Sequence, residues 1–349
     1  LIRPVTILHA ERLDFDGMSM GTFTARIAIN SKRMPVLSSS YPTGHRYKTG
    51  MGANAQKILR QFEEKGNFIF ISEKGECIIS SNFLDGGITM RIVVKIGTST
   101  LTHATGHLNI RRVAELCRVV SDIKNAGHEV ILVSSGAIGM GVGKLGLRQR
   151  PTDIPTKQAA AAVGQCELMY TYDKLFGEYH HTVAQLLITG EDVANEKRHR
   201  NFSNTLNKLL ELRAMPIINE NDTVATEEIV IGDNDTLAAI VAESVKAQLL
   251  VLLSDIDGLY TSDPRKDATA SLISEVRVLD DSVKALAGVS GSEQGTGGMI
   301  TKLQAAEICM GCGCDMVIAN GNDPEHLYDI LEGKQIGTRF VSDGKEQNR

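Results

Sequence analysis

From Arg91 onward, short apolar runs alternate with longer segments of helical periodicity, and this alternation restricts the fold more than any other feature. Each run has the length of a strand and is apolar almost throughout, so both faces of the strand should be buried. Such strands form mainly parallel sheets covered by helices on both sides. The sequence therefore predicts an α/β fold, a three-layer αβα sandwich with a mainly parallel central sheet. The predicted strands are Ile92–Ile96, Val130–Val133, Val183–Ile188, Pro216–Ile218, Gln248–Leu253 and Met316–Ala319.

Signals for helix ends support helices between these strands. Asn109 is a residue type favoured at helix N-caps, and Gly127 is suited to end the helix that follows. Apolar residues recur between them at helical spacing, at Ile110, Val113, Leu116, Val120 and Ile123. An alanine-rich segment near 158–175 predicts a second long helix.

Residues 1–89 do not share this rhythm. They contain stretches rich in Ser, Tyr, Pro and Gly, one candidate helix near 53–64 and one hairpin-like pair near 68–79. This composition favours an N-terminal extension that is poorly ordered or non-native, with a small regulatory domain as the alternative. Because Met90 directly precedes the first strand, it is a candidate natural start, and we expect the folded domain over 90–349.

Bulk composition excludes several classes of protein. The 349 residues carry a net charge of −5, without the basic stripe of a nucleic-acid-binding face. No apolar run reaches the roughly 18 residues of a membrane span, and the N-terminus lacks a signal-peptide pattern. Six cysteines are too few for a disulfide scaffold in a chain of this length. We therefore expect a cytoplasmic protein without a nucleic-acid or membrane partner.

A lysine ends the first predicted strand, in the segment Lys95-Ile-Gly-Thr-Ser99. Burying a lysine is costly unless its ammonium group meets an anion. The Gly-Thr-Ser that follows offers backbone N–H groups and hydroxyls suited to a phosphate. The alternative is a lysine that extends to the surface before an ordinary turn. A P-loop enzyme is disfavoured, because the spacing Gly-x4-Gly-Lys-Ser/Thr is absent.

A glycine-rich segment, Ser134–Gly143, follows the second predicted strand. Its glycines allow a ligand or a neighbouring backbone to approach closely. The segment resembles a dinucleotide-binding fingerprint, but the acidic residue expected about 20 residues on, at the end of the next strand, is missing. A Rossmann dehydrogenase is therefore disfavoured, and close packing of a helix on the sheet is the alternative role.

Two polar clusters, Asn219–Asp222 and Asp233–Asp235, stand at the ends of predicted elements. The first ends an apolar strand, and the second opens an alanine-rich helix. Strand ends and helix N-termini are where an open α/β sheet gathers ligand-binding groups. Packing does not require so many carboxylates and amides at these junctions, so we predict the wall of a polar small-molecule site.

The segment Gly295–Lys302 gives the strongest phosphate-binding signal, because a glycine-rich loop leads into a helix N-terminus. A lysine in the first helical turn opposes the macrodipole, and a bound phosphate would relieve that conflict. A further strand end, Ser254-Asp255, could hold a nucleotide or a metal. Simple turn formation by the Asp-Gly and Asp-Pro pairs that follow is the alternative.

We predict no site in which protein ligands alone complete a metal centre. Cys309, Cys312 and Cys314 have Cys-x2-Cys-x-Cys spacing, but no second Cys or His pair stands nearby in the sequence to complete four zinc ligands. The aspartates from Asp255 onward match only the start of an EF-hand loop, whose twelfth position requires a glutamate.

In order along the chain, these motifs resemble those of the amino acid kinase family, over about Met90 to Val341. Within the family, the paired Asn-Glu-Asn-Asp and Gly-Asp-Asn-Asp are similar to those of members that phosphorylate the side-chain carboxylate of L-glutamate. The resemblance implies ATP, Mg²⁺ and L-glutamate as ligands and L-glutamyl 5-phosphate as product, in the first step of proline synthesis. Residues 1–89 match nothing in the family, and we expect no RNA-modification-type C-terminal domain. The matching segments are 95–99, 133–138, 218–226, 232–235, 253–255 with 258–260, and 295–299 with 301–302.

The resemblance also implies roles for individual residues. Lys95 and Lys302 would neutralise charge on the moving phosphoryl group, while Asp235 holds their ammonium groups in position. The residues implied to bind glutamate are Ser135, Asp222 and Asn234. The residues implied to contact ATP are Lys95, Ser254, Asp255, Thr296, Gly297, Gly298, Met299, Ile300, Thr301 and Lys302. Mg²⁺ would bridge the ATP phosphates with few direct protein ligands.

Two other functions stay open: a related kinase for N-acetylglutamate or aspartate, and a non-catalytic amino-acid sensor with the same fold. The sensor is disfavoured because binding alone does not require two transition-state charges held by an aspartate. The resemblance further implies a homodimer or homotetramer, glutamyl phosphate reductase as a functional partner, and proline as feedback inhibitor, with 190–204 as its candidate site.

Overall fold

The computed structural model describes residues 68–71, 77–80, 89–103, 107–225, 233–287 and 298–342. The chain divides into two units, Leu1–Ile88 and Thr89–Arg349. In the first unit, β1 (Phe68–Ile71) and β2 (Cys77–Ser80) pair in antiparallel fashion. The hairpin predicted near 68–79 is therefore present, whereas the helix predicted near 53–64 lies outside the described residues.

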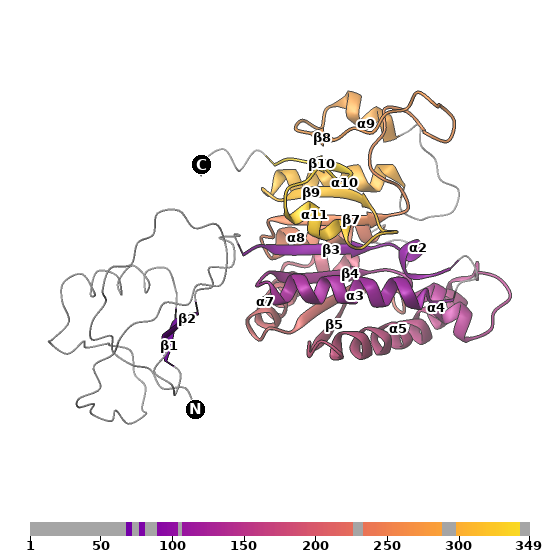
Figure 1. The fold of residues 1–349 in the computed structure, drawn as a ribbon. Coiled ribbons are helices and arrows are strands. Elements are labelled where there is room, and N and C mark those ends of the chain that lie inside the picture. Colours follow the sequence, from indigo (N-terminus) through magenta and orange to yellow (C-terminus); the bar gives the residue numbers. More distant parts are fainter. Residues whose placement is uncertain are drawn as a thin grey trace, which may run out of the picture. The chain divides into compact units, whose positions relative to one another are not determined.

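The second unit is built on a sheet in which eight strands of the described chain are joined in the order β5-β6-β4-β3-β7-β9-β10-β8 (Figure 1). The pairs from β5 to β9 are all parallel, while β10 runs antiparallel to β9 and parallel to β8. All the predicted apolar runs are strands of this sheet, and the prediction missed only β8 and β10, which are very short. The strands are β3 (Arg91–Ile96), β4 (Glu129–Ser134), β5 (Val183–Ile188), β6 (Met215–Glu220), β7 (Leu249–Ser254), β8 (Glu275–Val276), β9 (Asp315–Asn320) and β10 (Thr338–Phe340).

Helices cover both faces of the sheet, which confirms the predicted three layers. Along β3, Val93 faces a core shared with α7, α8 and α10, whereas its neighbours Ile92 and Val94 face a second core shared with α3, α5 and α11. Asn109 caps α3 as predicted, since its side chain accepts a hydrogen bond from Arg112 N at 3.2 Å. The helices are α2 (Thr98–Leu101), α3 (Ile110–Asn125), α4 (Ala137–Lys144), α5 (Ile154–Gly177), α6 (Gly190–Ala194), α7 (Glu196–Glu211), α8 (Asn234–Ser244), α9 (Asp281–Ala287), α10 (Met299–Gly311) and α11 (His326–Leu331). Among the described residues, none of these helices has both the length and the apolarity needed to cross a membrane.

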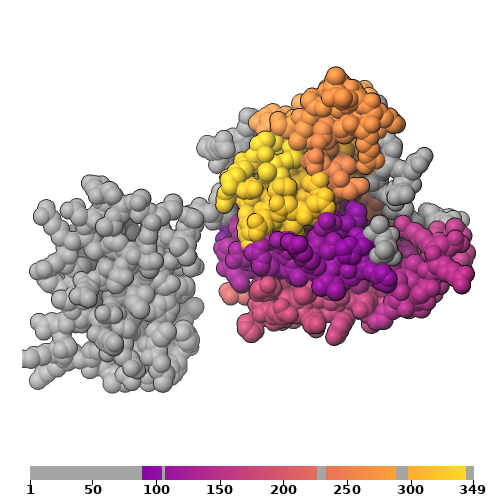
Figure 2. Space-filling view, turned by 45° about the vertical axis from the view of Figure 1, so that its right-hand side comes forward, coloured from indigo at the N-terminus to yellow at the C-terminus, as the bar shows by residue number. Residues whose placement is uncertain are grey.

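The strand order divides this unit into two halves that meet at β3. Strands β4, β6 and β5 lie on one side of β3, and β7, β9, β10 and β8 lie on the other. In the space-filling view, the early part of the unit (indigo to pink) and the late part (orange to yellow) accordingly form opposite sides (Figure 2). Because β3 to β7 and β9 are parallel, their carboxyl ends reach one edge of the sheet, where a site can draw on both halves.

Glycines allow α4 and α5 to pack at very short distance. A Cβ atom added to Gly141 would lie 1.8 Å from the carbonyl oxygen of Ala160, and one added to Gly164 would lie 1.7 Å from that of Ala137. Gly136 has a different role, since its φ of 99° places the N-cap of α4 in the left-handed region that favours glycine. Close packing therefore accounts for Gly141, although the partner is a helix rather than the sheet.

We expect Gly141→Ala to lower the free energy of unfolding by at least roughly 2 kcal/mol, because the new methyl group must push the two helices apart. Urea denaturation measures this change. Gly177→Ala, in the last turn of α5, is the matched control, because a Cβ there meets nothing within 4 Å. It should leave stability unchanged or raise it by up to about 1 kcal/mol. Equal stabilities of Gly141→Ala and the wild type would contradict the packing argument.

Candidate active site

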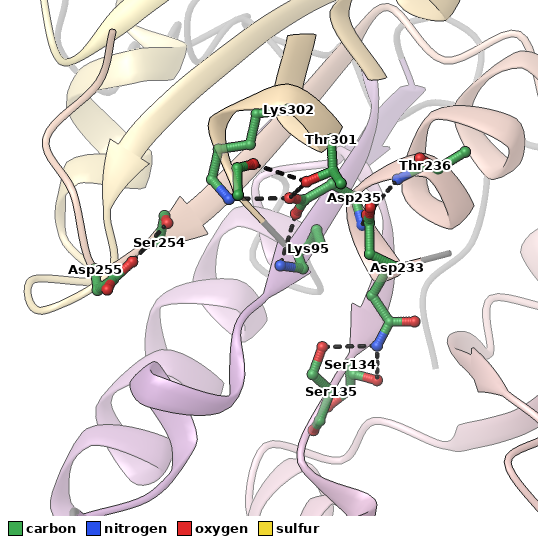
Figure 3. A network of polar contacts seen from close by, with 12 residues as sticks. Lys95, Ser134, Ser135, Asp233, Asp235, Thr236, Ser254, Asp255, Thr301 and Lys302 are labelled. Carbon is green, nitrogen blue, oxygen red and sulfur yellow. Dashed lines mark hydrogen bonds and ion pairs between the residues drawn. The ribbon is translucent and has the colours of Figure 1, made fainter. Parts of the chain in front are cut away.

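A buried carboxylate holds two lysines at the carboxyl edge of the sheet (Figure 3). Lys95, near the end of β3, forms an ion pair from Nζ to Asp235 Oδ1 at 2.6 Å. Lys302, in the first turn of α10, donates to Asp235 Oδ2 at 2.9 Å. Asp235 is fully buried, and the two lysines are only 8% and 4% exposed. One carboxylate thus fixes two positive charges, one on β3, where the two halves meet, and one on α10.

The start of helix α8 sets the position of this carboxylate. Asp233 is the N-cap, and its side chain accepts hydrogen bonds from Asp235 N at 2.5 Å and Thr236 N at 2.9 Å. The cap directs Asp235 into the first turn, where the macrodipole favours a negative charge. Thr301 adds a hydrogen bond from Oγ1 to Asp235 Oδ2 at 3.2 Å.

The pKa values of Asp233 and Asp235 are shifted in opposite directions. Burial alone would raise the pKa of Asp235, but the ammonium groups of Lys95 and Lys302 outweigh it and hold that pKa below its usual value. Burial, with the charge of Asp235 beside it, raises the pKa of Asp233. Asp235 is therefore ionised at neutral pH. It supplies one negative charge to the two ammonium groups that it contacts.

Asp235 also accounts in part for the lysine that opposes the dipole of α10. The helix pattern alone suggested a bound phosphate as the reason for Lys302, and the family resemblance implied Asp235 as its partner. In the structure, Asp235 on α8 is a carboxylate partner of Lys302. Gly298, the N-cap of α10, provides no side-chain cap, so backbone N–H groups of the first turn stay available to an anion.

A second polar network joins the predicted substrate residues Ser135 and Asn234. Asn234 Nδ2 donates to Ser135 Oγ at 2.6 Å, to Ser134 O at 3.3 Å and to Asn219 Oδ1 at 3.1 Å. Asn219 Nδ2 in turn donates to Gln165 Oε1 at 3.0 Å. Asn219 belongs to a cluster that the sequence singled out, but Gln165 was missed. Its only sequence signal is one polar residue on an otherwise small and apolar face of α5.

Asp222 lies just beyond the end of β6 and is half-buried. Burial raises the pKa of its carboxyl group, and the charge of Arg150 partly offsets this rise. Within the described part of the chain, Asp222 makes no hydrogen bond to Ser135 or Asn234, so the fold does not tie the three predicted glutamate residues into one network.

The predicted ATP residues fall into three groups. Five of them line one pocket with apolar side chains such as Leu286 and with Tyr260, and these five are Ser254, Asp255, Gly298, Met299 and Lys302. Ser254 Oγ donates to Asp255 Oδ1 at 3.1 Å within this wall. Lys95, Ile300 and Thr301 do not line the pocket: the first and last contact Asp235, and Ile300 is exposed. Thr296 and Gly297 lie outside the described residues.

The described ranges contain no group of three or more His, Cys, Asp or Glu side chains that could hold a metal ion. The cysteines near the end of α10 are free thiols. Cys309 and Cys314 are buried, while Cys312 is exposed and donates from Sγ to Cys309 O at 3.3 Å.

Comparisons with known proteins give one consistent family. The sequence profile of the amino acid kinase family matches residues 90–320. A glutamate 5-kinase from Clostridium perfringens is 53% identical over 256 residues, which are 72% of this chain and 95% of the relative. A glutamate 5-kinase from Listeria monocytogenes is 51% identical over 260 residues, with 73% and 94% covered.

Solved structures agree on the fold. Carbamate kinase from Giardia lamblia bound to AMP-PNP superposes with a TM-score of 0.55 at 14% identity, covering 74% of this chain and all of that one. The isopentenyl phosphate kinase product complex of T. acidophilum gives a TM-score of 0.51 at 19% identity, covering 72% and 99%. At these identities the likeness concerns the fold alone.

Proposed function

This chain belongs to the amino acid kinase family, and we propose that it transfers the γ-phosphoryl group of ATP to the side-chain carboxylate of L-glutamate. The resemblance inferred from its motifs is confirmed by glutamate 5-kinase relatives that are 51–53% identical over nearly their whole length. The protein is accordingly an ATP-dependent kinase. Its product, L-glutamyl 5-phosphate, enters proline synthesis.

The observation that carries this proposal is the pair of lysines held on Asp235. The acceptor carboxylate, with a pKa of about 4.3, is already ionised at neutral pH and needs no general base. The barrier instead comes from bringing one anion to another, so catalysis depends on alignment and on positive charge at the transferred group. Lys95 on β3 and Lys302 on α10 supply two such charges at fixed positions.

ATP is proposed to bind on the β7–α10 side. The pocket there is lined by the apolar side chains of Leu286 and Met299, which suit a base, and by Lys302, which suits a phosphate chain. Ser254 and Asp255 line the same pocket and offer oxygen atoms, the ligand type that Mg²⁺ prefers. When bound with ATP, Mg²⁺ supplies further neutralisation of the phosphate charge.

Glutamate is proposed to bind on the β4–β6 side, between Ser135, Asn234 and Asp222. The Asp222 carboxylate is suited to the ammonium group of the amino acid. Asn234 Oδ1 accepts no hydrogen bond from any described residue and is a second acceptor for that group. The two substrates would then meet at β3, beside Lys95.

The direct test measures ADP release with ATP and Mg²⁺ in the presence of L-glutamate, L-aspartate or N-acetyl-L-glutamate. Trapping with hydroxylamine identifies the acyl phosphate. We expect turnover that depends on glutamate and forms γ-glutamyl hydroxamate. Turnover with N-acetylglutamate or aspartate instead would transfer the assignment to a related kinase, and binding of glutamate without turnover would favour a sensor. Proline added to the same assay tests the implied feedback inhibition.

We expect Asp222→Asn to raise the KM for glutamate about tenfold, the worth of one hydrogen bond to a charged group, while the KM for ATP changes less than about twofold. Because burial raises the pKa of Asp222, the wild-type KM for glutamate should rise on acidification at a higher pH than an exposed aspartate would give. The variant should lose this dependence. Asp173→Asn, on the exposed surface of α5, is the control. Equal changes in both KM values would contradict the assignment of Asp222.

A further inference from the structure

A chain of side-chain amides leads from the buried face of α5 to the proposed glutamate site. Gln165 Oε1 accepts a hydrogen bond from Asn219 Nδ2 at 3.0 Å. Asn219 Oδ1 accepts from Asn234 Nδ2 at 3.1 Å and from Glu220 N at 3.0 Å. Asn234 Nδ2 also donates to Ser135 Oγ at 2.6 Å. The series of amides begins at Gln165, which is only 7% exposed, and ends at Asn234, which is proposed to contact the substrate.

This series of hydrogen-bonded amides has a direction, because each amide donates only through nitrogen and accepts only through oxygen. Asn219 presents its oxygen to Asn234 and to the backbone, so its nitrogen must face Gln165, which in turn must present oxygen. Asn234 then uses its nitrogen toward Asn219 and Ser135, and its oxygen is turned away from them. If the amide of Gln165 were reversed, two N–H₂ groups would face each other.

Gln165 also carries a cost that packing alone does not explain. Its Nε2 is buried and has no hydrogen-bond partner among the described residues, so the contact to Asn219 is the one hydrogen bond that its side chain makes there. A buried donor without a partner is unfavourable. An apolar side chain would fill the same place on α5, between Ala161 and Leu168, without that cost. The oxygen that Gln165 presents to Asn219 is therefore the feature that distinguishes it from an apolar residue.

We infer that Gln165 is a positioning residue for the amino-acid substrate: it fixes the amide orientation of Asn219 and, through it, turns Asn234 Oδ1 toward the ammonium group of glutamate. An ammonium group only donates hydrogen bonds, so the site must present acceptors to it. The inference rests on the proposed function, since it takes Asn234 as a glutamate contact. It predicts that Gln165 controls discrimination between glutamate and a dicarboxylate that lacks the amino group.

The experiment compares the KM for L-glutamate with the inhibition constant of glutarate, which has the same two carboxylates and no ammonium group. In Gln165→Met, which keeps the length of the side chain but offers no strong acceptor, we expect the KM for glutamate to rise about tenfold. The inhibition constant of glutarate and the KM for ATP should stay within about twofold of the wild type. Gln165→Glu, which keeps an oxygen toward Asn219, should retain the wild-type ratio of the KM for glutamate to the inhibition constant of glutarate.

Three results would overturn the inference. Equal increases of both constants in Gln165→Met would indicate a general structural role, and unchanged constants would indicate none. Loss of discrimination in Gln165→Glu to the same extent as in Gln165→Met would show that the acceptor oxygen is not the relevant feature. If Gln165→Met does not fold, Gln165→Ala takes its place with the same expectation. Wild-type turnover separates the two levels: without glutamate turnover the proposed function fails, whereas normal turnover with unchanged discrimination in the variant refutes only the role of Gln165.

Discussion

Replacing Asp235 with Asn should lower kcat by at least about 10²-fold and the free energy of unfolding by roughly 3–5 kcal/mol. The stability loss follows because Asp235 is the carboxylate that Lys95 and Lys302 share, and both lysines are buried. A neutral amide leaves two ammonium groups close together without compensation. The activity falls because the lysines lose the group that fixes their distance from the transferred phosphoryl group. Urea denaturation without nucleotide and the ADP-release assay measure the two effects.

Glu129→Gln is the matched control for Asp235→Asn. Glu129 also pairs with a β3 residue, Arg91 at 2.8 Å, but that pair is partly exposed and lies at the opposite end of the strand. Exposed ion pairs contribute at most about 1 kcal/mol, so Glu129→Gln should leave kcat unchanged and stability nearly so. A similar stability loss in both variants would mean that burying the ion pairs of Asp235 does not increase their contribution to stability.

The stability effect of Asp235→Asn should depend on pH in one direction. Because the pKa of Asp235 in the folded state lies below its usual value, its stabilisation is complete above the pKa of an unfolded aspartate, about 3.9. That stabilisation is lost as the pH falls through the lower folded value. The difference in unfolding free energy between wild type and variant should therefore shrink on acidification below about pH 4.

Replacing Lys302 with Met should lower kcat about 10²- to 10³-fold, the scale for removing one charge contact made in the transition state. Lys302 lines the pocket proposed for ATP and also pairs with Asp235. It is therefore the lysine that we expect to contact the phosphoryl group during its transfer. Stability should change much less than in Asp235→Asn, because Lys95 still pairs with the carboxylate. Single-turnover kinetics with saturating ATP separates the chemical step from nucleotide binding.

Lys284→Met is the control for Lys302→Met. Lys284 lies on α9 and pairs with Glu307 of α10 at 2.9 Å, with both side chains exposed. Its removal should leave kcat within about twofold of the wild type, because exposed pairs are weak and screened. An unchanged kcat in Lys302→Met would remove this lysine from the proposed mechanism.

Much of the parallel sheet could be predicted because each long strand carries its own pattern. β3, β4 and β7 are apolar runs long enough to be recognised from neighbouring residues alone. β8 and β10 have two and three residues and show no periodicity. β10 is instead positioned by distant contacts, such as the hydrogen bond that Thr338 Oγ1 accepts from Leu259 N at 2.8 Å.

The candidate site divides in the same way. Lys95, Asp235 and Lys302 stand at a strand end and at helix starts, where polar residues are conspicuous against apolar neighbours, so the sequence pointed to each of them. Gln165 lies inside a helix and has no such local signal. Its position beside Asn219 depends on how α5 crosses the end of β6, because the two residues are 54 positions apart.

The sequence by itself determined the alternation of strands and helices, the polar strand ends and the identity of the charged groups, because these depend on residues close together in the chain. The contact of Lys95 and Lys302 with one buried carboxylate was implied only through the family resemblance, and the tertiary structure supplies its geometry. Only the tertiary structure places Gln165 within hydrogen-bond distance of Asn219. These contacts depend on β3 lying between β4 and β7 and on α8 packing beside α10. That order of elements is set by packing over the whole unit, and no local pattern encodes it.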